Sequence, residues 1–154
     1  MNRYRKATFD DLRDIYSLIC DMEETLLPVD SFAEIFKKQV GDEHHYILLC
    51  EIDGSTVGFI NLRYEEQLHH AAEIAEIMEF VVHKDYRNRG IGGAMLEQAC
   101  SLARDRGCIQ IEVACNQLRH DTHRFYEREG MKNFHFKFSM NLTGAEDPEN
   151  KIGR

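Results

Sequence analysis

The sequence has no long apolar run, and no stretch approaches the roughly 20 residues that a membrane-spanning helix needs. Its first residues, Met1 to Arg5, lead into polar sequence and not into the apolar segment of a secretory signal. These two absences argue against a membrane protein and against an exported one. We therefore expect a cytoplasmic protein.

Paired cysteines are also missing. The five cysteines are odd in number, scattered along the chain and free of any Cys-x-x-Cys motif. This pattern argues against a disulfide framework and favours reduced, mostly buried thiols, which suits a cytoplasmic protein.

Positive charge is scarce, with 19 lysines and arginines against 27 acidic residues and a formal net charge of −8. A strongly acidic chain is a poor partner for nucleic acid or for an anionic membrane surface, so neither is expected. One short stretch, from Lys84 to Arg89, is nevertheless locally basic. A positive island on an acidic protein suits a small anionic ligand.

The chain shows no internal repeats, no low-complexity segment and no interdomain linker. Its 154 residues, of which 43% are hydrophobic, are enough to bury the core of one domain. We predict a single domain over residues 1–142, followed by a polar tail over residues 143–154.

Apolar periodicity and turn signals predict six strands and four helices. The expected strands are Arg3 to Thr8, Tyr46 to Ile52, Thr56 to Tyr64, Ile74 to His83, Ile109 to Ala114 and Phe134 to Leu142. The first expected helix begins near Leu12 and ends before Pro28. The other three cover Ser31 to Val40, Ile91 to Arg106 and Leu118 to Glu129. The order β-α-α-β-β-β-α-β-α-β predicts an α+β sandwich with a mixed sheet and helices on its faces.

The segment Arg87-Asn88-Arg89-Gly90-Ile91-Gly92-Gly93 follows an expected strand and opens an expected helix. A helix N-terminus presents unpaired backbone N–H groups and a partial positive charge, which together attract phosphate. Glycines let the backbone approach the anion, and arginines add forked donors. The segment therefore predicts a cradle for a diphosphate.

Two common phosphate-binding motifs do not fit this segment. A P-loop ends in Lys-Ser or Lys-Thr, which is absent here. A dinucleotide-binding fingerprint needs a third glycine where Met95 stands, and it belongs in an opening βαβ unit instead of after a hairpin.

A third motif does fit. Arg87-x-x-Gly90-x-Gly92 matches the Arg/Gln-x-x-Gly-x-Gly/Ala pattern of the GNAT superfamily of N-acetyltransferases, and the later stretch Arg124 to Met131 resembles that family's Phe-Tyr-Glu-Lys-x-Gly-Phe signature. A closer resemblance, to bacterial aminoalkylphosphonate N-acetyltransferases, is carried by Leu68 to His70, Arg119 to Tyr126 and His135 to Phe138. The resemblance implies a GNAT fold with a sheet of six to seven strands and about four helices.

The resemblance also implies acetyl-CoA as cosubstrate and assigns residues to it. The pyrophosphate is expected on the loop, and the pantetheine arm along the strand before it, bound by strand addition. The residues concerned are Phe80, Val81, Val82, Arg87, Asn88, Arg89, Gly90, Ile91, Gly92 and Gly93. Asn116, just after a later strand, is a further candidate for contacting the cofactor.

Acetyl transfer to an amine needs a base for the ammonium and an acid for the departing thiolate. The signature of the family assigns the acid to Tyr126. Glu79, two residues before Val81, is the first candidate for the base, acting directly or through water. Glu76, Glu112 and water alone remain rivals, and alternation along a regular strand puts Glu73 and Glu79 on one face and Glu76 on the other.

The substrate is the least determined feature. A small primary amine is implied, with an aminoalkylphosphonate as first choice, whereas a polyamine, an aminoglycoside, a protein N-terminus or a non-catalytic acyl-CoA-binding role remain alternatives. Arg63, Arg119 and Arg124 are the candidate cations for a phosphonate. The resemblance also implies a divalent metal, for which His120 and His123 are candidate ligands, and it leaves a homodimer open.

Overall fold

The computed structural model describes residues 1–146. Two compact units divide the chain, Met1–Ala114 and Cys115–Arg154. The first unit contains the whole sheet and three of the described α-helices, and the second contains the remaining helix. Most of the predicted polar tail, residues 147–154, lies outside the described residues.

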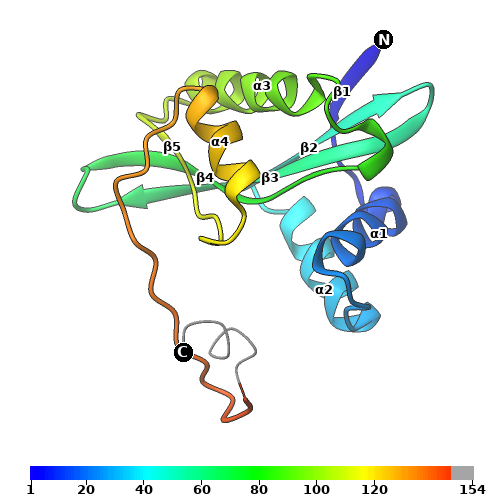
Figure 1. Cartoon of the computed structure of the whole chain (residues 1–154), viewed down its shortest axis with the longest axis horizontal. Coiled ribbons are helices and arrows are strands. Elements are labelled where there is room, and N and C mark those ends of the chain that lie inside the picture. The colour runs from blue at the N-terminus through cyan, green and yellow to red at the C-terminus, as the bar shows by residue number, and fades with distance from the viewer. Residues whose placement is uncertain (147–154) are drawn as a thin grey trace. The chain divides into compact units, whose positions relative to one another are not determined.

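The sheet of the first unit has five strands in the order β1-β2-β3-β4-β5 (Figure 1). Their bounds are Asn2–Lys6, His45–Ile52, Ser55–Gln67, Ala72–Val82 and Ile111–Val113. The first four strands pair antiparallel, and β5 pairs parallel with β4. The predicted mixed sheet is therefore confirmed.

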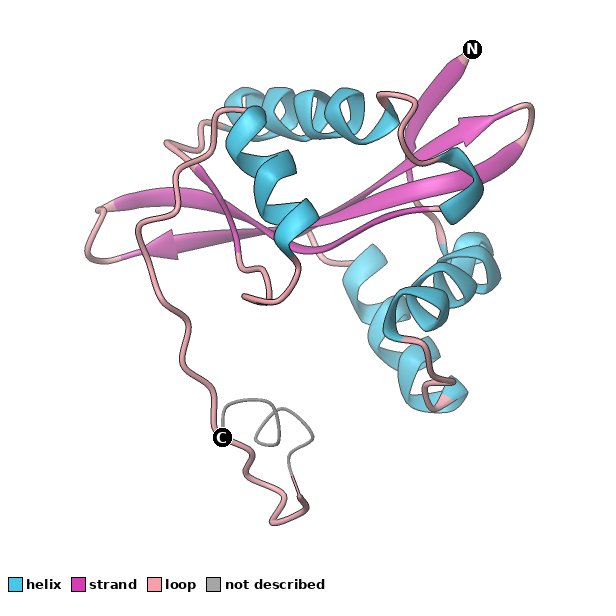
Figure 2. Cartoon of the chain, viewed as in Figure 1, coloured by secondary structure: helices cyan, strands magenta, loops and turns pink. Residues whose placement is uncertain are grey.

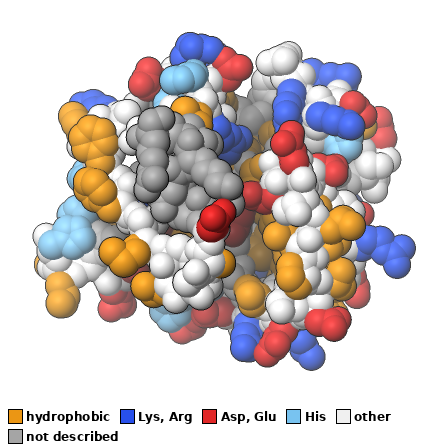
Figure 3. Space-filling model, turned by 60° about the horizontal axis from the view of Figure 1, so that its bottom comes forward, with side chains coloured by type: hydrophobic (Ala, Val, Ile, Leu, Met, Phe, Trp, Pro, Cys, Tyr) orange, Lys and Arg blue, Asp and Glu red, His pale blue; other side chains and the backbone are white. Residues whose placement is uncertain are grey.

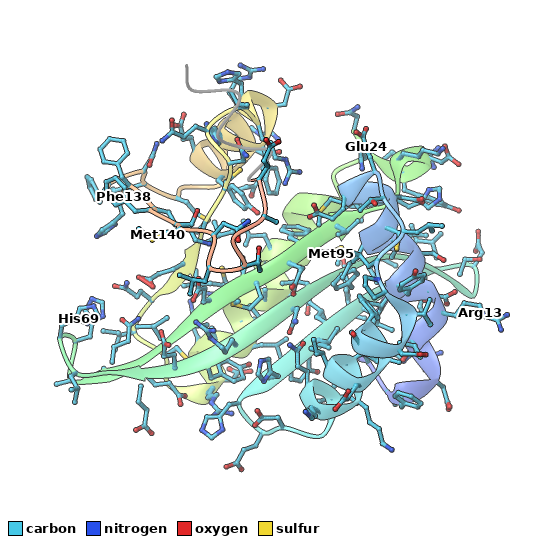
Figure 4. The ribbon with its side chains drawn as sticks, turned by 90° about the horizontal axis from the view of Figure 1, so that it is seen from below. Arg13, Glu24, His69, Met95, Phe138 and Met140 are labelled. Atoms are coloured by element: carbon cyan, nitrogen blue, oxygen red, sulfur yellow. The ribbon has the colours of Figure 1, made fainter. Side chains whose placement is uncertain are left out.

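The expected hairpin between β2 and β3 forms around Asp53 and Gly54, both of which have positive φ angles, 51° and 78°. A two-residue hairpin turn needs such angles because its twist must match that of the strands. The longer hairpin between β3 and β4 carries His69 at its tip (Figure 4).

Helices cover both faces of the sheet (Figure 1). α1, Leu12–Glu23, and α2, Val29–Val40, pack on one face against a cluster that includes Leu49, Phe59 and Val81. α3, Ile91–Arg106, packs on the other face, where Ala103 meets Ala75 and Tyr64. The two apolar clusters hold the strands between them, because burial of apolar surface is the main stabilising contribution.

The prediction of six to seven strands is wrong for the described residues, which form five. The missing element is the closing strand expected from Phe134 to Leu142, which is irregular in the structure and drawn as a loop in Figure 2. Its alternating apolar side chains are mostly exposed, and Phe138 and Met140 are 92% and 82% exposed (Figure 4). Alternation specifies the faces of a strand, but a strand also needs a hydrogen-bonding neighbour, and this backbone forms no ladder.

The second unit contains α4, His120–Arg128. It begins two residues after the expected start at Leu118 and ends one residue before the expected end at Glu129. The Glu129 and Gly130 N–H groups bond back to the carbonyls of Phe125 and Glu127, so Gly130, with a φ of 96°, ends the helix as its sequence position predicts.

Candidate active site

β4 contains a bulge close to its C-terminal end. Asn61 of β3 faces Glu79, but the next residue, Leu62, faces Ile77, so Met78 is the extra residue. An extra residue reverses the alternation of side chains along a strand. The expectation that Glu73 and Glu79 share a face is therefore wrong.

Contacts confirm that reversal. Glu73 binds Arg106 of α3, with 2.7 Å between Oε1 and Nε, whereas Glu79 accepts a hydrogen bond of 2.8 Å from Asn61. Arg63, two residues after Asn61 on β3, binds Glu76 at 2.8 Å. Glu76 and Glu79 thus lie on the face that α1 and α2 partly cover, and Glu73 lies on the α3 face.

A pocket of about 550 Å³ opens where β4 ends. Val81, Val82 and the turn after them form one side, and the end of α1 with the residues after it forms the other. Glu24, in a left-handed conformation with a φ of 55°, ends α1 beside this opening (Figure 4). The lining residues are Leu18, Cys20, Asp21, Glu24, Thr25, Leu26, Val81, Val82, His83, Lys84 and Arg87.

The expected diphosphate loop follows that pocket. Arg87 donates from Nε to the Val82 carbonyl at 3.0 Å, so its guanidinium is held at the end of β4. Asn88 and Gly90 have positive φ angles of 61° and 78°. The guanidinium of Arg89 lies 5.2 Å from the centre of the Tyr86 ring.

Helix α3 starts immediately after the loop. The first helical bond runs from the Ala94 N–H to the Gly90 carbonyl. The N–H groups of Ile91, Gly92 and Gly93 precede that bond, so the helix itself gives them no acceptor. The sequence-predicted loop residues therefore come together as a backbone donor site at a helix N-terminus.

Gly58 of β3 pairs with Val82 at the C-terminal end of β4. A Cβ atom at this position would lie 2.7 Å from the Val81 carbonyl oxygen and 3.0 Å from the sulfur of Met95 on α3. Only glycine permits this approach without displacing backbone. The sequence contained the glycine, but nothing in it indicated that the position supports Val81.

Glu79, the first candidate for the base, is half-buried. Burial raises the pKa of its carboxyl group above the usual range, and the Glu23 carboxylate adds to that effect. The Asn61 hydrogen bond and the nearby His45 lower the same pKa. Desolvation is the largest of these contributions.

The rival carboxylates have other partners. Glu76 binds Arg63, and Glu112 on β5 accepts a hydrogen bond from Gln110 at 3.0 Å. Glu76 and Glu112 face each other across the parallel ladder between β4 and β5. That ladder extends only from Ala75 to Ile77, so it ends before the bulge.

Tyr126, the candidate acid, lies on α4 in the second unit and is half-buried. Burial raises the pKa of its hydroxyl to about 12, and the Arg119 side chain opposes that shift. The phenol is therefore protonated throughout the neutral range, as a proton donor must be.

Asn116 is exposed, and its side-chain oxygen accepts a hydrogen bond of 2.8 Å from the Leu118 N–H. Its carbonyl lies 2.7 Å from Nε2 of His123.

Burial raises the pKa of the neighbouring Cys115 thiol, which disfavours the thiolate that a covalent acetyl-cysteine route would need. Arg124 pairs with Asp121 one turn away.

Candidate metal ligands do not gather. Within residues 1–146, no three His, Cys, Asp or Glu side chains are arranged to hold a metal ion. His120 and His123 stack edge to face with their ring centres 6.0 Å apart, and no carboxylate or thiol completes a site with them in the described part of the chain. The described side chains by themselves therefore form no site for the divalent metal that the resemblance implied.

No helix in the described part of the chain is long and apolar enough to cross a membrane. Acidic and basic side chains are interspersed on the face that Figure 3 presents.

Comparison with known proteins identifies the family. Residues 9–131 match the acetyltransferase (GNAT) family. The aminoalkylphosphonate N-acetyltransferase of Salmonella typhimurium is 38% identical over 138 residues, covering 90% of each chain. An uncharacterized N-acetyltransferase of Archaeoglobus fulgidus is 25% identical over 137 residues, covering 83% of this chain and 91% of its own length.

Solved structures give the same fold. A protein from Bacillus halodurans described as a transcriptional regulator superposes with a TM-score of 0.85 at 26% identity, covering 92% of this chain and all of the other. A putative acetyltransferase from Agrobacterium tumefaciens has a TM-score of 0.82 at 20% identity, over 91% of this chain and 99% of its own. The match over residues 9–131 and the sequence similarity together show that this chain belongs to the acetyltransferase (GNAT) family and is an acyltransferase.

Proposed function

We propose that the protein transfers the acetyl group of acetyl-CoA to the amine of an aminoalkylphosphonate. The observation that carries the proposal is the pocket at the end of β4, bordered by Val81, Val82 and Arg87 and followed by a glycine loop at the α3 N-terminus. The Salmonella typhimurium relative, 38% identical over nearly the whole chain, supports the choice of amine.

The donor is held mainly by backbone groups in this proposal. The N–H groups of Asn88 to Gly93 and the guanidinium of Arg87 bind the pyrophosphate. The pantetheine arm runs along Phe80 to Val82 and pairs with main chain there. A backbone N–H near Val81 holds the thioester oxygen and stabilises the oxyanion that forms from it.

Two side chains move protons. Glu79 takes one from the substrate ammonium, directly or through water, so that the amine nitrogen can attack the thioester carbon. The carbon–sulfur bond then breaks, Tyr126 donates its hydroxyl proton to the departing thiolate, and the second proton that the nitrogen loses as the amide forms restores the Tyr126 hydroxyl. The role of Tyr126 comes from its place in the signature Arg124 to Met131, and Asn116 is assigned to the cofactor by its position after β5.

One observation favours a second candidate, an amine without an anionic group. Arg63 was expected to serve as a cation for the phosphonate, but it donates to Glu76 at 2.8 Å and to Glu65 at 3.5 Å. Together with Glu79, these carboxylates make this part of the sheet acidic, which suits a cationic amine such as a polyamine. The phosphonate then depends on Arg119, on Arg124, which already pairs with Asp121, or on a divalent metal, for which the described side chains by themselves form no site. Measurement of activity after chelation tests the metal.

The assay that separates these alternatives measures coenzyme A release from acetyl-CoA with a panel of amines. An aminoalkylphosphonate, the matched alkylamine without the phosphonate, a polyamine, an aminoglycoside and a peptide with a free N-terminus make up the panel. The proposal predicts the highest kcat/KM for the aminoalkylphosphonate. Preference for the polyamine favours the second candidate, and acetyl-CoA binding without turnover of any amine would indicate a non-catalytic acyl-CoA-binding protein. A homodimer also stays a prediction, which sedimentation tests.

A further inference from the structure

Asn61 is a buried polar residue in the middle of an apolar strand. It is 4% exposed, and its neighbours on β3, Ile60 and Leu62, are fully buried. Burying an amide costs free energy unless its groups are hydrogen-bonded, and an apolar side chain would avoid that cost. The position therefore calls for an explanation beyond packing.

The contacts of Asn61 join three elements of the first unit. Its Nδ2 group donates to Oε2 of Glu79 on β4 at 2.8 Å and to Oε1 of Gln39 on α2, also at 2.8 Å. Both amide hydrogens are thereby used, and they fix the plane of the side chain. The Oδ1 atom is buried and has no hydrogen-bond partner among the described residues. The hydrogen bonds of the side chain therefore all come from its Nδ2 donors.

Glu79 has few other polar partners. His45 of β2 and Glu23 at the end of α1 act on it only through their charges and in opposite directions. Arg63 of β3 lies on the same face but is engaged by Glu76 of β4. Gln39 of α2 accepts a hydrogen bond from Asn61, and no hydrogen bond joins Gln39 to Glu79 among the described residues.

We propose that Asn61 is a positioning residue, which orients the carboxylate of Glu79 for proton abstraction and is itself held by Gln39. The inference rests on the proposed function, because it assigns to Glu79 the role of base. Asn61 touches no reacting atom in this account. Its amide donors stabilise the charged carboxylate, which is the form that accepts a proton, against the desolvation that disfavours that form.

The first test needs no turnover. ¹³C NMR follows the titration of the Glu79 carboxyl group in the full chain, with Glu79→Gln identifying the signal. Asn61→Leu keeps the size of the side chain and removes the donors, so the titration midpoint should rise by about one pH unit, which is what loss of a hydrogen bond to a charged group implies. Gln67→Leu, which removes an amide at the far end of β3, is the matched control and should leave the midpoint in place.

The second test is the pH dependence of kcat/KM for acetyl transfer. Asn61→Leu should move the acid limb up by the same amount and recover most of the parent rate at high pH, because Glu79 still ionises there. Gln39→Leu keeps the bond between Asn61 and Glu79 and should move the limb less. Thermal unfolding of each variant checks folding, and Asn61→Ala serves as a second variant if Asn61→Leu does not fold.

The outcomes separate the two proposals. An unchanged midpoint and an unmoved acid limb in Asn61→Leu would overturn the positioning role, as would a loss of rate that is equal at every pH. If the midpoint moves but the parent protein acetylates no amine, the positioning of Glu79 stands and the proposed function fails. If Glu79→Gln keeps the acid limb of the parent, Glu79 is not the base and Asn61 cannot act through it.

Discussion

At the residue scale, Glu79 is ionisable in a place that disfavours its charge. Burial is the dominant contribution to its raised pKa, and Asn61 offsets only part of it. A base with a raised pKa is a better proton acceptor near neutral pH than an ordinary glutamate. The same environment means that ionisation of Glu79 destabilises the folded state relative to the unfolded state.

Glu79→Gln tests both consequences. The variant should lose about 100-fold in kcat/KM, the usual contribution of a general base. Because the folded-state pKa is raised, the folded protein binds the proton more tightly than the unfolded one, so the stability that protonated Glu79 provides is lost as pH rises through its folded pKa. The variant should therefore unfold at a higher temperature than the parent at pH 8, and this gap should narrow as pH falls. Equal melting curves at pH 8 would contradict the assigned pKa shift.

Gly58 supports Val81 from below. Gly58→Ala would place a Cβ atom 2.7 Å from the Val81 carbonyl oxygen, so the end of β4 must shift. We expect a loss of about 1–3 kcal/mol in the free energy of unfolding, as for other overpacked sites, and a higher KM for acetyl-CoA. Gly41→Ala is the control, since its Cβ would meet only ordinary contacts of 3.6 and 3.8 Å. Chemical denaturation and steady-state kinetics measure both effects.

Tyr126 has a natural control in Tyr64. Burial raises the pKa of each hydroxyl to about 12, but Tyr64 lies in the apolar cluster under α3. Tyr126→Phe should lower kcat about 100-fold with little change in acetyl-CoA affinity, and Tyr64→Phe should not. Parent turnover in Tyr126→Phe would exclude the acid role. Since the Tyr126 phenol stays protonated below about pH 10, it should produce no basic limb in the pH profile below that value.

At the scale of elements, the loop before α3 has the backbone conformation that the proposed pyrophosphate site needs. Gly90 and Gly54 both have a φ of 78°, and at both positions a Cβ atom would meet only open space. Alanine should therefore cost about 1 kcal/mol of stability at either position, through backbone strain alone. Only Gly90→Ala, in the loop, should also raise the KM for acetyl-CoA, because Gly54 lies in the β2–β3 turn. Equal KM values for the two variants would remove the loop from the cofactor site.

Element boundaries were predictable wherever local chemistry sets them. Neighbouring residues determine the Asp53-Gly54 turn and the glycine that ends α3. They also determine the helical spacing of the apolar residues on α3. The bulge at Met78 was not predictable, because it depends on the register of β3 against β4, and it moved Glu76 to the face of Glu79. The strand expected after Phe134 failed for a similar reason, since alternation cannot supply a partner strand.

The same distinction between local and long-range contacts applies to the candidate site. The loop from Arg87 to Gly93 could be predicted because a contiguous motif encodes it. Asn61, Gln39 and Gly58 were missed because they come together only through strand pairing and helix packing. A single asparagine among apolar residues in the strand Thr56 to Tyr64 was the only available signal, and an amide in an apolar run is worth testing as a partner of a nearby acid.

At the scale of the whole molecule, the acidic composition and the proposed substrate are in tension. A net charge of −8 disfavours a dianionic phosphonate at long range, while the local cations Arg87 and Arg89 are assigned to the cofactor in our proposal. Binding of the phosphonate should therefore weaken less with salt than binding of acetyl-CoA, if both are measured by their KM values between low and high ionic strength. If the KM for the phosphonate rises more steeply with salt than the KM for acetyl-CoA, the phosphonate binds to a larger cationic site than we expect.

The proposed function depends most on one measurement: acetylation of an aminoalkylphosphonate by the full chain with acetyl-CoA, compared with acetylation of the same alkylamine lacking the phosphonate. We expect coenzyme A and the N-acetylated phosphonate to form in equal amounts, with a kcat/KM at least about tenfold above that of the plain amine, a difference of about 1.4 kcal/mol in transition-state binding. Equal or better turnover of the plain amine, or no acetylated product from either, would contradict it.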